Sequence, residues 1–380
     1  MIGDEVSLKA LFQQQDMVLS VQFRFGMDFS FREWTSTLNL YMARKSRFFS
    51  LALGVGLVWA ARQLVRYSRR FDVRNKVVLI TGGSRGLGLV LARQLATQQA
   101  KLILVARDAD ELQQAEESIA ELGAEVISIA CDMTNPAEVE DMIEESLNYY
   151  GRIDVLINNA GIIQIGPVDN MTLQEYDEAM ETHFFGPLHA IRAVLPHMKA
   201  RQEGRIVNIS SIAGKVAVPH LLPYSASKFA LSGLSKGLRT ELLHQGIHVT
   251  TVYPGLMRTG SPRHAIVKGE HQKEYAWFKI ADSLPLLTVS AEHAAQQIIE
   301  ALKQGRAELT VSVPAKLLAA LDHLFPELAA DIFGITNRFL PQPVPEAANP
   351  RKHGYEVESK ITHNGITQPS DEAAVENNEF

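Results

Sequence analysis

The sequence predicts a doubly wound α/β fold around a seven-stranded parallel sheet, and three observations support this prediction. From residue 76 onward, short β-branched runs alternate with stretches long enough to form helices, a pattern typical of a parallel sheet covered on both faces. Neither an internal repeat nor a linker rich in glycine and serine interrupts the alternation. Hydrophobic residues make up 46% of the chain, which is enough for a substantial core.

Seven short apolar segments are the expected strands of this sheet. They comprise residues 77–80, 102–105, 126–130, 155–157, 206–209, 248–252 and 309–313. Segments such as residues 87–99, 109–122 and 137–150 are long enough to be the crossover helices that parallel strands need. These elements predict one domain over residues 73–313, with an extension on either side.

Overall charge and cysteine content narrow the classes of protein to consider. The formal net charge is −6, so the overall charge does not favour binding to nucleic acid, and we expect no such partner. The one cysteine, Cys131, cannot form an internal disulfide. We therefore expect a reducing compartment, and we predict no metal site.

Residues 1–72 are expected to form an amino-terminal extension with an apolar membrane anchor at residues 48–65. The uncharged part of the anchor, residues 48–61, would rise about 21 Å as a helix, short of the roughly 30 Å of a hydrocarbon core. Spanning would need the Arg62 side chain to snorkel, so the helix either spans the membrane or lies in its interface. The alternative is an amphipathic helix packed on the protein's own surface or on a second subunit.

Basic residues flank the apolar segment on both sides. Three precede it between residues 44 and 47, and four arginines follow between residues 62 and 70. Arg74 and Lys76 extend the second cluster, and an excess of positive charge is typical of the cytoplasmic side. The sequence therefore predicts a membrane-associated protein whose main domain faces the cytoplasm.

Two further segments follow the expected domain. In residues 314–340, apolar side chains recur at near-helical spacing, with a break at Pro326. We expect an amphipathic helical extension that packs on the domain or on a partner subunit, with a second membrane contact as the alternative. In residues 341–380, proline, asparagine and acidic residues recur without a period, which predicts a disordered tail.

A glycine-rich turn follows the first expected strand and leads into an apolar helix. It reads Thr81-Gly82-Gly83-Ser84-Arg85-Gly86-Leu87-Gly88. Glycines at such a turn permit positive φ and close approach of the backbone to a pyrophosphate, while free N–H groups at the helix start face the anion. A lone glycine triplet would indicate only a turn, but its place between a buried strand and a helix predicts a dinucleotide site. The candidate contacts are Gly82, Ser84, Arg85, Gly86, Leu87 and Gly88.

The residues after the second strand bear on which dinucleotide binds. Arg107 directly follows that strand and Arg85 lies in the glycine-rich turn, so two guanidinium groups can converge on a 2′-phosphate. This arrangement favours NADP(H). If Arg107 is only a solvated charge and Asp108 merely caps the next helix, NAD(H) stays open.

A tyrosine and a lysine four residues apart are the candidate catalytic groups. Tyr224 and Lys228 would share one face of a helix, and a nearby ammonium would lower the pKa of the phenol so that it can exchange a proton with a substrate oxygen. Ser211 follows the fifth expected strand at the carboxyl edge of the sheet, where its hydroxyl could hold that oxygen. In isolation each residue would be unremarkable, but their order behind a nucleotide turn favours catalysis.

Together these motifs resemble the short-chain dehydrogenase/reductase family over residues 76 to about 260. The matching features are the turn at residues 81–88, Asp132, Asn158-Asn159-Ala160-Gly161, Ser211, Tyr224 with Lys228, and Pro254-Gly255 followed by Thr259. The resemblance implies a Rossmann-type fold, with Tyr224 as general acid in reduction and general base in oxidation. It also implies dimers or tetramers.

The resemblance extends the expected cofactor site beyond the glycine-rich turn. Asp132 would contact the adenine, Asn159 and its neighbours would line the cofactor, and Lys228 would hold the nicotinamide ribose beside Tyr224. Ile209 and the loop from Pro254 to Thr259 would flank the nicotinamide. The implied contacts in that loop are Pro254, Gly255 and Thr259.

One position departs from the family pattern. His183 stands where the family usually has an asparagine that helps to anchor a water in a proton relay behind the lysine. Histidine can also hold a water or exchange protons near neutral pH, so a relay can be retained. The alternative is a histidine satisfied by packing at a helix bend.

The segment after Thr259 bears on the substrate. Residues 261–287 contain Tyr275, Trp277, Phe278 and Ile280, and the family closes the corresponding segment over the substrate. Such a lid predicts a bulky, hydrophobic substrate that is lipid-like, long-chain or steroid-like. The predicted function is thus an NADP(H)-dependent oxidoreductase that interconverts a carbonyl and a secondary alcohol. The alternative is an NADP-binding scaffold without turnover.

Overall fold

We describe the chain from a computed structural model. The structure describes residues 54, 56–57, 60, 63–64, 69–363 and 365–380. The chain forms two units, residues 1–67 and residues 68–380, and the second contains the α/β domain. Most of the predicted anchor at residues 48–65 lies outside the described residues. Among the helices formed by the described residues, none is long and apolar enough to cross a membrane.

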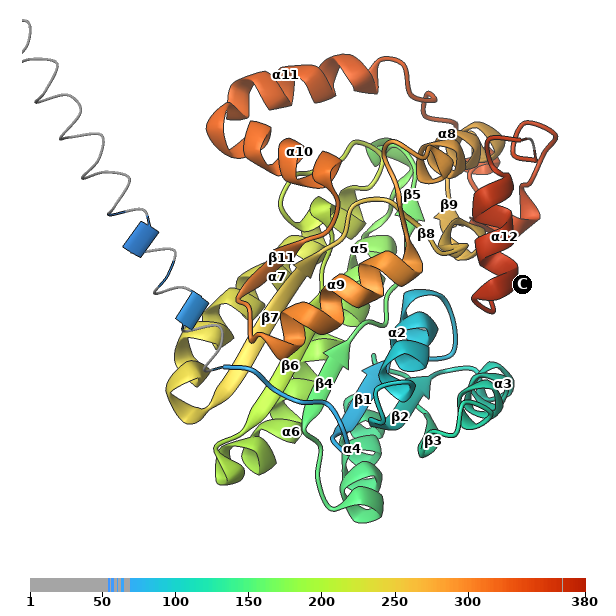
Figure 1. The fold of residues 1–380 in the computed structure, drawn as a ribbon. Helices are drawn as coiled ribbons and strands as arrows, with labels where there is room; N and C mark the ends of the chain where they lie inside the picture. The colour runs from blue at the N-terminus through green and yellow to red at the C-terminus, as the bar shows by residue number, and fades with distance from the viewer. Residues whose placement is uncertain (1–53, 55, 58–59, 61–62, 65–68, 364) are drawn as a thin grey trace, which may run out of the picture. The chain divides into compact units, whose positions relative to one another are not determined.

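A seven-stranded parallel sheet forms the centre of the domain (Figure 1), which confirms the predicted fold class. Its strands are β1 Val77–Thr81, β2 Lys101–Ala106, β3 Val126–Ala130, β4 Val155–Asn158, β6 Gly204–Ile209, β7 Ile247–Tyr253 and β11 Glu308–Thr310. All seven predicted strands are present. The last is shorter than predicted, because a helix begins at Val313.

The strand order creates the crevice in which a ligand can bind. The order across the sheet is β11-β7-β6-β4-β1-β2-β3, so the chain winds outward from β1 first in one direction and then in the other. β1 pairs with β2 on one side and with β4 on the other, all in parallel. Ligands of such sheets bind at the carboxyl ends of the strands where the order reverses. The glycine-rich turn leaves β1 at this point.

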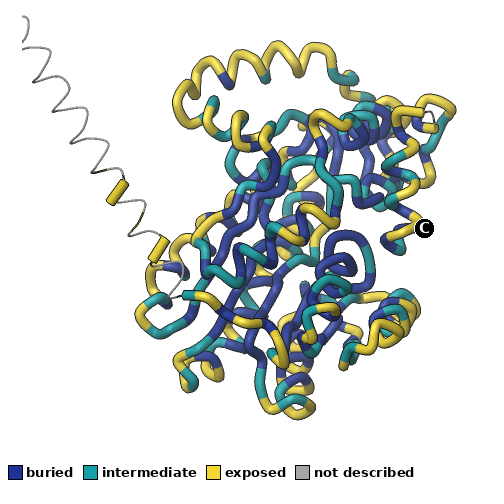
Figure 2. Tube along the Cα trace, viewed as in Figure 1, coloured by how far each residue is buried: buried dark blue, intermediate teal, exposed yellow. Residues whose placement is uncertain are grey.

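Helices cover both faces of the sheet, and each face has its own apolar core. On one face lie α2 Gly86–Ala96, α3 Ala109–Ala120 and α9 Ala291–Lys303. On the other lie α4 Pro136–Tyr150, α6 Gly186–Arg201 and α7 Leu222–Leu242, with α5 Leu173–Met180 packed against α7. The central strands β1, β4 and β6 are buried on both faces (Figure 2), which explains their apolar sequences.

Two of the crossover helices begin with side-chain caps that their sequences could have predicted. The Asp108 carboxylate accepts hydrogen bonds from the N–H groups of Asp110 and Glu111, both at 3.0 Å, at the start of α3. The Asn135 side chain accepts one from the Ala137 N–H at 3.1 Å at the start of α4. Such caps satisfy N–H groups that have no partner within the helix. Asp108 is therefore a helix cap.

Two smaller sheets form above the carboxyl edge of the main sheet. β5 Gln164–Ile165, β9 Ile266–Val267 and β12 Lys352–His353 form one, and β8 Met257–Arg258 pairs with β10 Val289–Ser290 in the other. Helix α8 His271–Ser283 lies between β9 and β10 in sequence and contacts both β8 and β9. These elements build the wall around the carboxyl edge.

Residues 314–340 form the expected helices, which contact the domain only in part and are largely exposed in the single chain. α10 Val313–Leu324 and α11 Pro326–Asn337 pack against each other as a hairpin with the predicted break at Pro326. Only Ala315 and Ala329 are buried in the two helices, and Figure 2 shows the hairpin largely exposed. The exposed apolar side chains of this segment are Val313, Leu317, Leu324, Phe325, Leu328, Ile332, Ile335 and Phe339.

The prediction that residues 341–380 are disordered is wrong for the described part of this tail. Strand β12 pairs antiparallel with β9, and helix α12 Gln368–Glu376 packs against α8 and β8. The tail buries few apolar side chains, so its sequence has no hydrophobic period. Ion pairs and hydrogen bonds to distant residues, such as Arg263 to Glu358 at 2.8 Å, hold it in place instead.

Candidate active site

The glycine-rich turn is packed so tightly that Gly82 and Gly88 have no room for a side chain. Gly82 and Gly86 have φ of +64° and +55°, which side chains rarely adopt. A Cβ on Gly88 would lie 1.9 Å from the Gly82 carbonyl oxygen, so the start of α2 rests directly on the turn. The start of α2 thus lies at the cleft, where the N–H groups of a helix start can bind a diphosphate.

Asn159 supports the same turn. Its side-chain amide donates hydrogen bonds to the carbonyl oxygens of Thr81 and Gly82, at 3.1 and 3.0 Å. The Thr81 hydroxyl in turn accepts from the N–H groups of Asn159 and Ala160, at 3.0 and 3.1 Å. The predicted Asn159 therefore lines the cleft and also fixes the shape of the turn that would cradle the cofactor.

The ribose end of the cleft contains a residue that the sequence analysis missed. The Glu111 carboxylate accepts hydrogen bonds from the Ser84 hydroxyl at 3.0 Å and from the Arg85 guanidinium at 2.7 Å. Arg107 is exposed at the cleft, and it forms no ion pair with any residue that the structure describes. Of the two predicted guanidinium groups, only that of Arg107 is uncommitted. The sequence did offer a signal for this contact, because Glu111 is an acidic residue in the first turn of the helix that follows Arg107.

Asp132 lies where the resemblance implies an adenine contact. One of its carboxylate oxygens accepts hydrogen bonds from the N–H and the hydroxyl of Thr134, both at 2.9 Å. Asp132 follows β3, and it lines the cleft beside Cys131 and Met133. The carboxylate is thereby oriented at the edge of the cleft.

Ser211, Tyr224 and Lys228 meet at the carboxyl edge of the sheet. Ser211 follows β6, and its hydroxyl forms hydrogen bonds with the Tyr224 phenol and with the N–H of Ala213, the latter at 3.1 Å. Tyr224 and Lys228 lie in the first turns of α7, and the Lys228 ammonium is 5.6 Å from the centre of the phenol ring. It donates a hydrogen bond to the Ile209 carbonyl at 3.0 Å. The structure thus brings the three predicted groups together.

The ionisation of this group differs from the expectation that the lysine lowers the pKa of the phenol. Burial lowers the pKa of Lys228 to about 7, so its ammonium is only partly charged near neutral pH. Burial raises the pKa of Tyr224 above its ordinary value, and the hydrogen bond from Ser211 opposes this shift. In this state the site therefore favours a protonated phenol, the form that can donate to a substrate oxygen.

His183 is a packed, neutral residue in a π-helical turn, Glu181–Phe185, between α5 and α6. Its Nε2 accepts a hydrogen bond from the Ile162 N–H at 3.1 Å, so the proton lies on Nδ1, which donates to the Ser227 hydroxyl at 2.8 Å. Burial, and next the Lys228 ammonium, hold the pKa of His183 well below its usual range. Through these two hydrogen bonds His183 links the loop that contains Ile162 to α7.

Comparison with known proteins agrees with this geometry. The sequence model of the short chain dehydrogenases matches residues 76–266, which hold every motif described above. The chain belongs to the short-chain dehydrogenase family. It is an oxidoreductase that acts on CH–OH groups with a nicotinamide cofactor, and the residues of the cleft fit such a cofactor.

Relatives in this family span most of the short-chain dehydrogenase domain. Dehydrogenase/reductase SDR family member 7B of Danio rerio is 34% identical over 272 residues, covering 69% of this chain and 85% of that protein. The putative oxidoreductase SadH of Mycobacterium tuberculosis is 35% identical over 250 residues, covering 65% and 90%. A crystal structure of a short-chain dehydrogenase from Streptomyces avermitilis is similar with a TM-score of 0.61 and 30% identity, covering 70% of this chain and 98% of that one.

The nicotinamide end of the dehydrogenase cleft is bordered by the loop that follows β7. The Pro254 carbonyl accepts a hydrogen bond from the Ile212 N–H at 2.7 Å, which ties this loop to the Ser211 turn. A Cβ on Gly255 would lie 2.9 Å from the Ser312 hydroxyl, so the loop also packs against the start of α10. Thr259 is buried and lines the cleft. The three predicted contacts therefore share one wall.

Some aromatic residues of the predicted lid line the cleft, and one contacts the carboxyl-terminal tail instead. Trp277 and Phe278 of α8 line the cleft, together with Leu318 of α10 and Phe333 of α11. Tyr275 is fully buried and points to the tail, where its hydroxyl donates a hydrogen bond to Glu358 at 3.2 Å. Expecting Tyr275 to face the substrate was therefore wrong. The cleft has a volume of about 1480 Å³, ample for a dinucleotide with a substrate beside it.

Proposed function

We propose that the enzyme uses NADP(H) to interconvert a carbonyl and a secondary alcohol on a hydrophobic substrate. The preference for NADP(H) rests on Arg107. This residue directly follows β2 at the ribose end of the cleft, and its guanidinium forms no ion pair with any described residue. A guanidinium binds a 2′-phosphate by paired, charge-assisted hydrogen bonds. Asp108, the acidic residue next to it, caps α3, which is the role that the NAD(H) alternative gives it, so the preference for NADP(H) rests on Arg107 alone.

The chemistry divides between the cofactor and three side chains. The cofactor supplies or accepts the hydride when it is bound. In reduction, the Tyr224 phenol donates its proton to the carbonyl oxygen, and the Ser211 hydroxyl holds that oxygen in place. Lys228, fixed by the Ile209 carbonyl, orients the ribose and offsets charge that develops on Tyr224. In oxidation the same groups take the alcohol proton.

Arg107→Ala tests the cofactor preference. We expect the Kd for NADPH to rise at least about tenfold, in line with the loss of one or more charge-assisted hydrogen bonds. The Kd for NADH should change less than twofold, since NADH has no 2′-phosphate. Fluorescence titration with both cofactors measures the two constants. Arg192→Ala, at an exposed position of α6 outside the cleft, is the control and should change neither constant. Equal losses for NADPH and NADH would contradict the NADP assignment.

The apolar wall of the cleft supports a hydrophobic substrate. Trp277, Phe278, Leu318 and Phe333 come from three helices and line one cleft. Apolar side chains gain free energy of about 25 cal/mol for each Å² that a ligand removes from water. The α10–α11 hairpin that contributes two of these side chains is itself apolar and exposed.

A panel of ketones of increasing size tests this preference. We expect kcat/KM to rise by about fourfold for each added methylene group until the apolar wall is covered, as buried hydrocarbon predicts. NADPH oxidation followed with straight-chain and cyclic ketones gives these values. Phe333→Ala should flatten the trend, while Tyr149→Ala, at an exposed position on α4, should not. A higher kcat/KM for short polar carbonyls would contradict the proposal.

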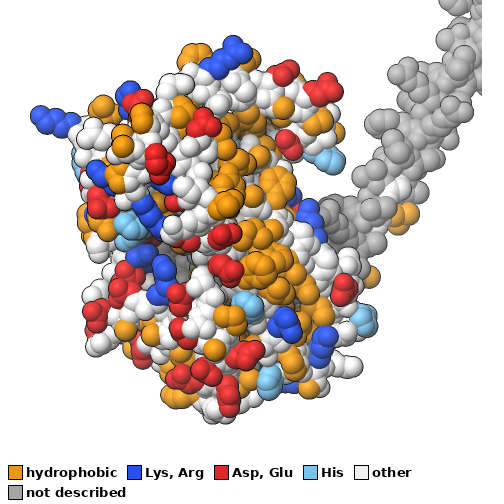
Figure 3. All heavy atoms as spheres, turned by 180° about the vertical axis from the view of Figure 1, so that it is seen from behind, with side chains coloured by type: hydrophobic (Ala, Val, Ile, Leu, Met, Phe, Trp, Pro, Cys, Tyr) orange, Lys and Arg blue, Asp and Glu red, His pale blue; other side chains and the backbone are white. Residues whose placement is uncertain are grey.

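We also propose that the protein associates with a membrane through residues 48–65 and that its catalytic domain faces the cytoplasm. The uncharged run between basic clusters supports this proposal. Hydrophobic side chains also form a band on the face of the domain in Figure 3, and a membrane would bring hydrophobic substrates close to the cleft.

Removal of residues 1–67 tests the membrane association. We expect the full chain to sediment with lipid vesicles and the truncated chain to stay in the supernatant. The truncated protein should bind cofactor with an unchanged Kd, because the domain starts at residue 68. Removal of residues 1–43 alone, which leaves the apolar segment in place, is the control and should not reduce sedimentation. A full chain that stays in solution with vesicles present would contradict the proposal.

A further inference from the structure

The carboxyl-terminal tail returns to the cofactor cleft. After β12 the chain passes α8 and ends with α12 and residues 377–380 beside the start of α2 (Figure 1). Glu379 is buried, and it lines the same cleft as Gly86 and Leu87. Neither the chemistry nor the fold of the seven-stranded sheet requires this arrangement.

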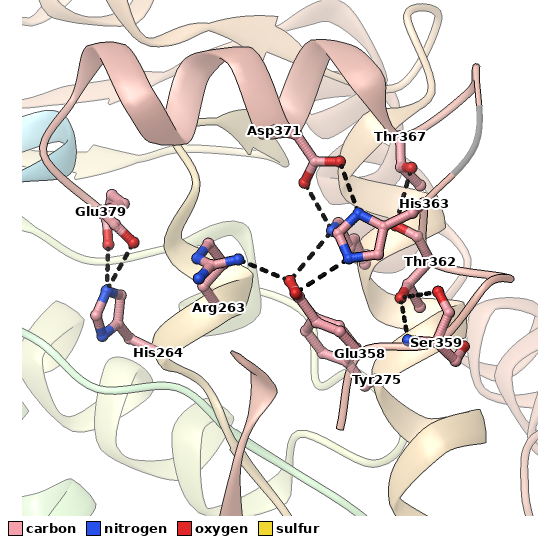
Figure 4. A network of polar contacts seen from close by, with 11 residues as sticks. Arg263, His264, Tyr275, Glu358, Ser359, Thr362, His363, Thr367, Asp371 and Glu379 are labelled. Atoms are coloured by element: carbon pink, nitrogen blue, oxygen red, sulfur yellow. Dashed lines mark hydrogen bonds and ion pairs between the residues drawn. The ribbon is translucent and has the colours of Figure 1, made fainter. Parts of the chain in front are cut away.

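A network of charged groups that includes Glu358, His363 and Asp371 fixes the middle of this tail (Figure 4). Lys279 of α8 is fully buried and pairs with Asp371 at 2.7 Å and with Glu358 at 3.5 Å. Arg263 and His363 also pair with Glu358, at 2.8 and 3.0 Å. Because the buried Lys279 charge is costly to leave unpaired, Glu358 and Asp371 form a fixed base from which the end of the chain extends.

The last residues bind the glycine-rich turn itself. The Gly86 N–H donates a hydrogen bond to the Asn377 carbonyl at 2.8 Å, and the Asn378 side-chain amide donates one to the Ser84 carbonyl at 3.1 Å. The Glu379 carboxylate lies 3.7 Å from the Arg85 guanidinium and 3.3 Å from His264. The last residues thus contact both the backbone of the glycine-rich turn and the guanidinium of Arg85.

The Glu379 carboxylate lies against Gly86, at the place where a cofactor diphosphate would approach the turn. A Cβ on Gly86 would lie 2.5 Å from a carboxylate oxygen of Glu379, so this oxygen fills the space that the glycine leaves open. In a glycine-rich turn that space allows the cofactor diphosphate to approach the backbone. A carboxylate near the first N–H groups of a helix and an arginine is placed as a phosphate oxygen would be.

We propose that residues 377–379 occupy the diphosphate part of the cleft when no cofactor is bound, and that the cofactor must displace them. The tail is then an internal competitor of the cofactor, anchored through Glu358 and Asp371. Its carboxylate is poorly solvated: burial raises the pKa of Glu379 to about 7, an effect that Arg85 opposes and Glu111 reinforces. A diphosphate brings two charges to the same groups, so it can replace a single carboxylate. The inference needs only a nicotinamide dinucleotide in this cleft, whichever of the two cofactors is preferred.

Titration of three variants with NADPH and with NADH tests the competition. Removal of residues 377–380 should lower the Kd for both cofactors by about tenfold. Without the tail, the cleft is open in every molecule, and the cofactor no longer has to displace a bound segment. Glu379→Gln keeps the size of the side chain but removes its charge, and it should lower both Kd values by about threefold or more. Glu376→Gln makes the same charge change at an exposed position of α12 and should leave them unchanged. Weaker or unchanged binding after removal of the tail would overturn the proposal.

Hydrogen exchange of the unmodified protein provides a second test that does not depend on a variant folding. The N–H of Glu379 donates to the Ala374 carbonyl at 2.8 Å and that of Asn377 to the Ala373 carbonyl at 3.0 Å. Saturating cofactor should increase the exchange rate of residues 377–380, while α2 becomes more protected. If the same amides exchange more slowly with cofactor, the tail clamps the cofactor and the proposal fails. Protection of α2 alone reports whether the cofactor binds at all.

Discussion

Tyr224→Phe is expected to lower kcat by about 10²- to 10⁴-fold, the range contributed by a positioned general acid or base. The phenyl ring keeps the packing of α7 against His183, whose ring centre lies 5.4 Å away, and only the hydroxyl is lost. Because that hydroxyl forms one hydrogen bond, with Ser211, stability should fall by no more than about 1 kcal/mol. The Kd for the cofactor should stay within about twofold of the original value, since binding rests on the turn and on Lys228.

Initial rates at saturating cofactor and ketone measure this effect, and Tyr149→Phe at an exposed position is the control. The raised pKa of Tyr224 also fixes the direction of the pH dependence. Reduction needs the protonated phenol, so its rate should hold across neutral pH. Oxidation needs the phenolate, so its rate should rise with pH over the same range. A Tyr224→Phe enzyme with an undiminished rate in either direction would contradict the mechanism.

The fold and the meeting of the three candidate catalytic groups could be predicted from the sequence because both depend on local patterns. A strand buried on both faces must be apolar throughout, and so residues 77–80 and 155–157 are recognisable without their neighbours. The turn before Gly88 and the spacing of Tyr224 and Lys228 likewise each fall within one short segment. The crossover rules then bring these segments to one edge of the sheet.

The pKa values could not be predicted, because they depend on burial. A lysine four residues from a tyrosine lowers the pKa of the phenol only if the lysine is charged. In the folded protein the Lys228 ammonium loses its solvent, and its pKa falls to about 7. The same loss of solvent acts on Tyr224 in the opposite direction. The result depends on how deeply the first turns of α7 are buried, which no spacing along the chain reveals.

The tail was missed for a different physical reason. Helix α12 buries only Ser370 and Ala374 among its residues, so its sequence has no apolar stripe. Its order comes from ion pairs between groups far apart in the chain, such as Lys279 and Asp371. Composition alone could not distinguish such a segment from a disordered one, since both are polar and charged.

Gly88→Ala is expected to disrupt the cofactor site more than any other single methyl group in the turn. The added Cβ would lie 1.9 Å from the Gly82 carbonyl oxygen and 2.7 Å from the Asn159 side-chain amide. Backbone and not a flexible side chain is in the way, so α2 must move away from the turn. We expect a loss of about 1–3 kcal/mol of stability from overpacking. A shift of about 1 Å in the N–H groups that face the diphosphate should lower kcat/KM about 100-fold.

Gly237→Ala provides the matched control, because the same methyl group is added to an exposed glycine of α7 with no atom within 4 Å. Alanine favours the helix, so this variant should gain up to about 1 kcal/mol of stability without a change in cofactor affinity. Thermal unfolding and cofactor titration of both variants separate the effect of the methyl group from that of its position. If Gly88→Ala bound cofactor as tightly as Gly237→Ala, the contact between α2 and the turn would not be what shapes the site. If Gly88→Ala lost affinity while staying folded, the close approach of helix and turn would itself be the determinant of cofactor binding.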